Sequence, residues 1–196
     1  MRLFVAIDLE DAIRQRIIRF MDGVRGFAPE ARWVKPESLH VTLKFIGEMP
    51  LESLHAVKRE LEAVRAHPTS IKFAGWGFFP NPKAARVFWV GMRADPNLEK
   101  LASAVASALS KLRVPLEERR YQPHLTLARG GGRSGAPGRL KSDRRNADFE
   151  KLQAKLAGLP AAEFGSMTAC EFFLYHSQLS PAGSRYTKLE SFALAP

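Results

Sequence analysis

Two hydrophobic periods take turns along the chain. Alternation of apolar and polar residues is typical of strands with one buried face, whereas apolar residues three and four apart are typical of amphipathic helices. The alternating pattern predicts strands at 2–7, 39–45, 71–79, 86–92, 123–128, 168–176 and 185–194. The helical pattern predicts helices at 13–24, 54–64, 95–112 and 149–156.

Strands interspersed with helices indicate a mixed α/β or α+β protein. A chain of 196 residues, 45% of them hydrophobic, can bury a substantial core. Its length fits one compact domain or two small lobes that share a cleft.

Two of the predicted strands contain the same motif, His-x-Thr followed by leucine. Side chains two residues apart share one face of a strand, so His40 and Thr42 point together, as do His124 and Thr126. The alternate residues then face the core. In the first strand these are Leu39, Val41, Leu43 and Phe45.

The repetition of this motif is unlikely to be accidental. Random placement predicts only about 0.13 His-x-Thr matches in a chain with this number of each residue. A third match begins at His67, but His67-Pro68-Thr69-Ser70 is a polar turn without the apolar backing, and we set it aside as a loop. His55, on a helix surface, and His176, near a strand end, are interpreted as structural.

A pair of imidazoles with two hydroxyls suits the hydrolysis of a cyclic phosphodiester. One ring can take a proton from water while the other protonates the leaving oxygen, because imidazole titrates near neutral pH. Threonine hydroxyls can donate hydrogen bonds to phosphate oxygens. The alternatives are two structural histidines or a zinc site, although zinc needs further ligands that the motif does not supply.

The chain is basic, with a formal net charge of +10. An excess of this size favours the capture of polyanions, but it equally fits an ordinary basic protein. Residues 130–145 combine glycines and proline with several arginines, which predicts either a solvated connector or a basic arm that touches RNA backbone.

Export and membrane insertion are not expected. The apolar run at the amino terminus is interrupted by Asp8, and no segment is long enough to span a bilayer. The single cysteine, Cys170, lies in an apolar stretch and is interpreted as a small core residue. We therefore expect a cytoplasmic protein without disulfides.

The chain resembles the two-histidine phosphoesterases of the RNA 2′,3′-cyclic phosphodiesterase type, also called 2′-5′ RNA ligase or LigT-like. The similarity extends over nearly the whole length and is strongest at 2–8, 39–47, 87–91, 123–129 and 185–189. The basic segment at 130–145 matches no motif of this family.

This resemblance implies an α+β fold of two pseudo-symmetric lobes, each an antiparallel sheet backed by helices, with the active-site cleft between them. The whole chain, 1–196, would form one such bilobal domain. It further implies hydrolysis of RNA 2′,3′-cyclic phosphate ends to a 2′-phosphate, with neither metal nor cofactor. His40 would be the proton donor and His124 the proton acceptor, with Thr42 and Thr126 holding the phosphate.

Three further residues are candidates for binding substrate. Arg129 follows the second motif as in similar proteins, yet strand alternation places it on the face opposite His124 unless the strand ends or curls there. Phe4 could stack on a base, although a core role is also expected, and Tyr186 and its neighbour Arg185 are weaker candidates.

Two other functions stay open at this level. The same groups could join RNA ends through a 2′-5′ bond, because a reaction and its reverse use the same groups. A non-catalytic RNA-binding module would instead depend on charge and aromatic residues alone. The partner in each case is RNA, and nothing in the sequence requires more than a monomer.

Overall fold

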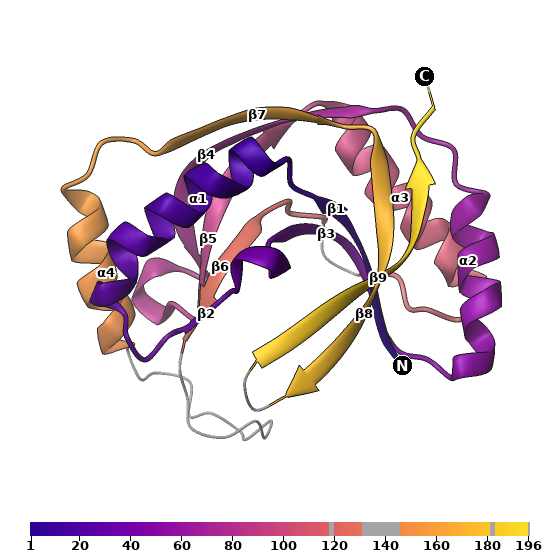
Figure 1. Ribbon diagram of the computed structural model, residues 1–196, viewed down its shortest axis with the longest axis horizontal. Coiled ribbons are helices and arrows are strands. Elements are labelled where there is room, and N and C mark those ends of the chain that lie inside the picture. Colours follow the sequence, from indigo (N-terminus) through magenta and orange to yellow (C-terminus); the bar gives the residue numbers. More distant parts are fainter. Residues whose placement is uncertain (118–119, 131–145, 181–182, 196) are drawn as a thin grey trace.

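The computed structural model describes residues 1–117, 120–130, 146–180 and 183–195. These residues form two antiparallel sheets and four α-helices (Figure 1). The helices are α1 (Asp11–Val24), α2 (Leu54–Glu62), α3 (Pro96–Ser110) and α4 (Ala147–Ala157). The strands are β1 (Arg2–Asp8), β2 (Arg32–Trp33), β3 (His40–Glu48), β4 (Thr69–Phe79), β5 (Val87–Ala94), β6 (Leu125–Arg129), β7 (Glu163–Ala169), β8 (Glu171–Ser180) and β9 (Gly183–Ala193).

Each sheet defines one lobe. The first lobe is built on the sheet with strand order β3-β1-β8-β9, and the second on the sheet with order β2-β6-β5-β4-β7. Both lobes contain the same unit, a strand, a helix and a returning strand that pairs antiparallel with the first. In one unit β1, α1 and β3 have these roles, and in the other β5, α3 and β6. The expected α+β fold with two related lobes is confirmed.

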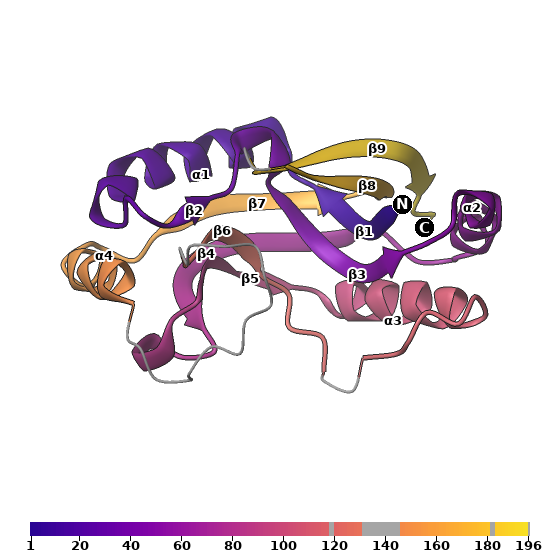
Figure 2. The same cartoon turned by 90° about the horizontal axis from the view of Figure 1, so that it is seen from below.

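The helices of the two units pack across the molecule. Helix α1 follows β1 of the first sheet but packs against β7 of the second (Figure 1). Helix α3 follows β5 of the second sheet but contacts β3 of the first as well as β4 (Figure 2). This exchange of helices ties the two lobes together. None of the helices in the described ranges is long and apolar enough to cross a membrane.

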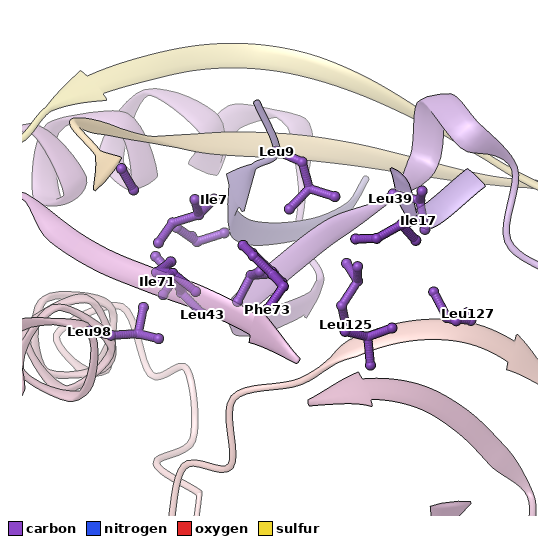
Figure 3. Packing of buried hydrophobic residues seen from close by; sticks show 14 of the residues in the cluster. Ile7, Leu9, Ile17, Leu39, Leu43, Ile71, Phe73, Leu98, Leu125 and Leu127 are labelled. Carbon is purple, nitrogen blue, oxygen red and sulfur yellow. The ribbon is translucent and has the colours of Figure 1, made fainter. Parts of the chain in front are cut away.

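One hydrophobic core runs between the two sheets. Figure 3 shows residues of both lobes meeting there, with Ile7 and Leu43 from the first sheet, Ile71 and Leu125 from the second, and Leu98 from α3. All five are at most 4% exposed, and so is Leu127, so the leucines that follow each His-x-Thr pattern fill the core as the alternation predicted.

Helix starts follow local sequence chemistry. The Asp95 carboxylate accepts a hydrogen bond from the Asn97 amide, and Pro96 occupies the first turn of α3. At α4, the Asn146 side chain accepts from the amides of Asp148 and Phe149. These caps explain why the predicted helices begin close to where they are observed.

The strand predicted at 168–176 is wrong as a single element. Strand β7 ends at Ala169 and pairs with β4 in the second sheet, whereas β8 begins at Glu171 and pairs with β1 in the first. Cys170 is the residue between them and is exposed, so its interpretation as a core residue is also wrong. The two-residue strand β2 was not predicted.

A bulge interrupts alternation in each motif strand. In β3, Thr42 pairs with Ala6 and Lys44 with the adjacent Val5, so Leu43 is the additional residue. In β6, Thr126 pairs with Trp89 and Ala128 with Phe88, so Leu127 is additional. The two bulges occupy equivalent places, directly after each His-x-Thr. The residues directly beyond each bulge change face, and in β3 a second register shift follows between Phe45 and Gly47.

The bulge in β3 overturns the prediction that Phe45 faces the core. Phe45 is 53% exposed, whereas its neighbour Lys44 is only 4% exposed. Inside the protein the Lys44 ammonium donates to the Pro115 carbonyl at 2.7 Å and lies 3.2 Å from a Glu117 carboxylate oxygen.

Candidate active site

The two His-x-Thr motifs line one cavity where the lobes meet. Strands β3 and β6 belong to different sheets but approach each other at the centre of the molecule (Figure 1). His40, Thr42, His124 and Thr126 all line this interlobe cavity, which also includes Phe4, Phe45, Arg129, Ser177, Ser184 and Tyr186. The sequence pattern placed the four motif residues on matching strand faces, and the structure brings them to a common space.

Both imidazoles are held in the same way. The Nδ1 atom of His40 lies 2.7 Å from the Ser38 carbonyl, and Nδ1 of His124 lies 2.8 Å from the Gln122 carbonyl. A carbonyl only accepts, so each Nδ1 is the protonated nitrogen. In the neutral ring, Nε2 therefore has the free lone pair. Each histidine is thus fixed by the carbonyl two residues before it, with a basic Nε2.

The two motif segments are also linked to each other. The Tyr121 hydroxyl donates a hydrogen bond to the backbone carbonyl of Thr42 at 3.0 Å. Tyr121 lies three residues before His124, so this bond joins the segment that positions one histidine to the strand that contains the other.

The bulges also account for Arg129. Because Leu127 is an additional residue, Arg129 returns to the face of His124 and Thr126 and lines the same cavity. Simple alternation had placed it on the opposite face, and that expectation is wrong. Phe45 has the equivalent position in the first motif, five residues after its histidine, and the sequence analysis had assigned it to the core.

Burial lowers the pKa of both histidines. The pKa of His40 falls to about 4, mainly because burial disfavours the charged ring, and the Ser38 carbonyl and the Asp8 carboxylate oppose this fall. Burial likewise lowers the pKa of His124, and the Gln122 carbonyl opposes it. The positive charge of Arg129 lowers both pKa values further. Both rings are therefore neutral at pH 7 in the free protein.

Asp8 introduces a difference between the two histidines. It pairs with His40 across the β1–β3 ladder, and its carboxylate is bridged by Arg14 and Lys188. Burial would raise the pKa of Asp8, but these two cations and the Leu9 amide bring it below its ordinary value. A negative charge consequently lies near His40, whereas among the described residues no carboxylate is a cause of the pKa shift of His124.

Phe4 and Tyr186 form an aromatic support for His40. The Phe4 ring lies 4.8 Å from the His40 ring and 5.0 Å from that of Tyr186, between ring centroids. Phe4 is only 2% exposed, which leaves almost no surface for a base and agrees with the core role that the sequence also allowed. Tyr186 is partly exposed and lies edge-on to His40 at 5.2 Å.

Several parts of the site were not anticipated. Phe45 offers the exposed aromatic surface that had been sought at Phe4, and Ser177 and Ser184 add hydroxyl-bearing residues from β8 and β9. Both serines lie in the gap between the strands predicted at 168–176 and 185–194, so the sequence pattern gave no sign of either. Arg185 is exposed and does not line the cavity. The basic segment at 131–145 lies outside the described residues.

Across residues 1–117, 120–130, 146–180 and 183–195, no group of three or more histidine, cysteine, aspartate or glutamate side chains is placed to hold a metal ion.

Known proteins resemble this chain over its full length. Proteins named RNA 2′,3′-cyclic phosphodiesterase are 35% identical in Archaeoglobus fulgidus, with 98% of this chain and 99% of the relative covered, and 33% identical in Methanothermobacter thermautotrophicus, with 98% of each covered. Escherichia coli LigT complexed with 3′-AMP has a similar structure, with a TM-score of 0.76, 29% identity and coverage of 100% of this chain and 98% of that one.

A family model described as LigT like Phosphoesterase matches residues 7–89 and again residues 90–186. The two matches divide the chain much as the two strand–helix–strand units do, with one His-x-Thr motif in each. The resemblance inferred from the motifs is therefore confirmed, and the chain belongs to the LigT like phosphoesterase family.

Proposed function

We propose that this chain hydrolyses the 2′,3′-cyclic phosphate at RNA ends, without a metal ion, and leaves a 2′-phosphate. The observation that supports this most directly is the convergence of both His-Thr pairs on one cavity, with each imidazole held so that Nε2 is basic. The names of the relatives from Archaeoglobus and Methanothermobacter support the same substrate.

His124 acts as the base in this proposal. Its neutral Nε2 takes a proton from a water molecule as the water oxygen attacks phosphorus. The lowered pKa keeps this nitrogen unprotonated at neutral pH. The hydrogen bond from Nδ1 to the Gln122 carbonyl becomes stronger as the ring gains positive charge, which favours the proton transfer.

His40 acts as the acid. The bond from phosphorus to the 3′ oxygen breaks, and protonated His40 gives its Nε2 proton to that oxygen. The negative charge of Asp8 favours the protonated ring, and the anionic phosphate adds to this effect on binding. Binding of the phosphate anion raises the pKa of the His40 ring, which then takes up its proton from solvent. The nearby Asp8 carboxylate, which contributes to the pKa of His40 and not to that of His124, favours His40 as the donor.

The remaining residues bind the phosphate and the terminal nucleoside. The Thr42 and Thr126 hydroxyls donate hydrogen bonds to the non-bridging oxygens, and the Arg129 guanidinium balances the charge that grows on them. The exposed ring of Phe45 provides a surface on which the terminal base stacks. Tyr186 supports the His40 ring from the side.

Product analysis tests this proposal. The protein is incubated with an oligonucleotide that ends in a 2′,3′-cyclic phosphate, in the presence of a strong chelator. The expected product has a 2′-phosphate, and a 3′-phosphate or a ligated product would contradict the assignment. Loss of activity in chelator that added metal restores would refute the metal-free mechanism.

Substitution of the histidines tests their roles. His40→Ala and His124→Ala should each lower kcat by roughly 10²- to 10⁴-fold, the usual contribution of a general acid or base. His67→Ala is the matched control, because His67 belongs to the third His-x-Thr match but is exposed and does not line the cavity. Equal losses in all three variants would contradict the assignment.

A further inference from the structure

A second cavity opens on the other side of His124. His124 lines both this cavity and the interlobe cavity, so the two spaces adjoin at the imidazole. We call the second space the Trp89 shelf and define it by Phe79, Trp89, Gly91, Arg93 and Tyr121. None of these residues has a role in the chemistry proposed above.

Aromatic rings form the surface of the shelf beside His124. The Phe79 ring lies edge-on to the His124 imidazole, with centroids 4.9 Å apart and planes at 86°. The Trp89 ring follows, 5.0 Å from Phe79 and tilted by 33°. Both rings are partly exposed. An aromatic surface therefore extends from the base that activates water in the proposed mechanism.

Glycines make room for the Trp89 ring. Gly77 is the cross-strand partner of Trp89, and a Cβ at Gly77 would lie 2.2 Å from the indole ring. A Cβ at Gly91 would lie 2.7 Å from the Ala74 carbonyl and 3.4 Å from the indole. The indole thus packs closely over the backbone at Gly77, where any other side chain would collide with it, whereas a side chain at Gly91 would collide with the Ala74 carbonyl.

The shelf contains a cation that has no partner within the described parts of the chain. Arg93 is exposed and makes no hydrogen bond or ion pair with any residue in the described parts of the chain, whereas Arg120 nearby is engaged by the Glu99 carboxylate at 3.0 and 3.2 Å.

We propose that the Trp89 shelf binds the nucleotide that precedes the cyclic end of the RNA, with its base stacked on Trp89 and Phe79 and its phosphate held by Arg93. This inference rests on the proposed function, because it extends the same substrate past His124. Stacking rings combined with an arginine that lacks a protein partner are the features with which proteins bind single-stranded RNA.

Comparison of two substrates tests the shelf. A mononucleoside 2′,3′-cyclic phosphate fills only the interlobe cavity, whereas a dinucleotide with the same cyclic end also reaches the shelf. We expect kcat/KM to be about tenfold higher for the dinucleotide, the effect of one stacked base. Equal values would overturn the inference while leaving the proposed function intact. Failure to hydrolyse either substrate would instead contradict the proposed function.

Substitution at the shelf should reduce this preference. Arg93→Gln should lower the ratio of the two kcat/KM values by several-fold, because the phosphate between the two nucleosides loses its cation. Lys72→Gln is the matched control. Lys72 is the cross-strand neighbour of Arg93 and is exposed, but it does not line the shelf. A ratio that falls equally in both variants would show a general charge effect and overturn the assignment.

A binding measurement tests the shelf without catalysis. A dinucleotide ending in a 2′-phosphate is titrated while tryptophan fluorescence is recorded, and the matching mononucleotide serves as the reference. We expect the dinucleotide to quench the signal more strongly, and Trp89→Phe to abolish the difference although Trp33 and Trp76 remain. A difference that persists in Trp89→Phe, or quenching that is equal for the two ligands, would overturn the inference.

Discussion

The hydroxyl of Tyr121 donates a hydrogen bond to the carbonyl of Thr42, 3.0 Å away, and thereby joins the two halves of the site. Thr42 belongs to the first motif strand, and Tyr121 lies three residues before His124 of the second. The buried Lys44 adds a parallel link from the same strand to Pro115. The relative position of the two histidines therefore depends on contacts between the lobes as well as on each sheet.

Tyr121→Phe should separate these contributions. Loss of one partly buried hydrogen bond should reduce the free energy of unfolding by about 0.5–1.5 kcal/mol. It should also lower kcat several-fold, because a small displacement between acid and base weakens proton transfer. Denaturant unfolding and steady-state kinetics measure the two effects. Tyr175→Phe is the control, since the Tyr175 hydroxyl makes no hydrogen bond within the described residues. A kcat unchanged in Tyr121→Phe would confine Tyr121 to a structural role.

Phe45→Ala should raise KM with little effect on stability. Because the Phe45 ring is 53% exposed, its removal takes away little buried surface. Loss of base stacking of about 1–3 kcal/mol corresponds to a roughly 5- to 100-fold increase in KM. Phe45→Trp should preserve binding. Leu51→Ala, at a residue that is 66% exposed and outside the cavity, gives the background for loss of an exposed apolar side chain. Similar KM values for Phe45→Ala and the wild type would exclude stacking.

The sequence predicted the residues of the site better than their arrangement. His40, Thr42, His124 and Thr126 were identified because strand alternation over two residues holds in both motifs. Alternation failed one residue later in each strand, where Leu43 and Leu127 form bulges. A bulge depends on the register of the partner strand, which local pattern does not contain. For this reason Phe45 was assigned to the core, and Arg129 was a candidate only on the condition that its strand ends or curls there.

The sequence pattern also failed to predict where the chain passes from one sheet to the other, for a related reason. No glycine or proline marks a break at Cys170, so 168–176 looked like one strand. The chain instead passes from one sheet to the other at Cys170, because the residues before it pair with β4 and the residues after it pair with β1. Both partner strands are distant in the sequence. Helices were easier to predict because their apolar spacing and capping residues are local.

Arg129→Gln should weaken substrate binding and shift the titration of the histidines. Loss of a charged donor to phosphate corresponds to about 1.5–3 kcal/mol, or a roughly 10- to 100-fold increase in KM. Because the Arg129 charge lowers the pKa of His40 and of His124, its removal should raise both pKa values. The pH profile of kcat/KM should therefore move to higher pH. Arg129→Lys should retain the profile while losing the bidentate contact. An unshifted profile in Arg129→Gln would contradict the electrostatic role.

The pH dependence of turnover follows from the lowered pKa values. In the free protein both histidines are neutral at pH 7, so the fraction with a protonated acid decreases as pH rises above the pKa of His40, about 4. We expect kcat/KM to be highest below pH 6.5 and to decline toward alkaline pH. The bound phosphate anion favours the protonated rings, so the profile of kcat should lie at higher pH than that of kcat/KM. Rates independent of pH from about 5 to 9 would be incompatible with acid and base catalysis by imidazole.

The low pKa of His40 also predicts that stability falls in acid. In the unfolded chain His40 has its ordinary pKa of 6.5, and in the folded protein about 4. Between these values the unfolded state binds the proton and the folded state does not, so the free energy of unfolding decreases as pH falls from 6.5 toward 4. The contribution is fully present above pH 6.5. By the conversion of 1.36 kcal/mol per pKa unit, it should amount to about 1–2 kcal/mol between pH 7 and pH 5.

Denaturant unfolding of the wild type and of His40→Gln at the two pH values isolates the contribution of His40, because all other groups titrate in both proteins. The wild type should lose more stability than His40→Gln by that amount. Equal losses would show that His40 is protonated alike in the folded and unfolded states and would contradict the lowering of its pKa by burial.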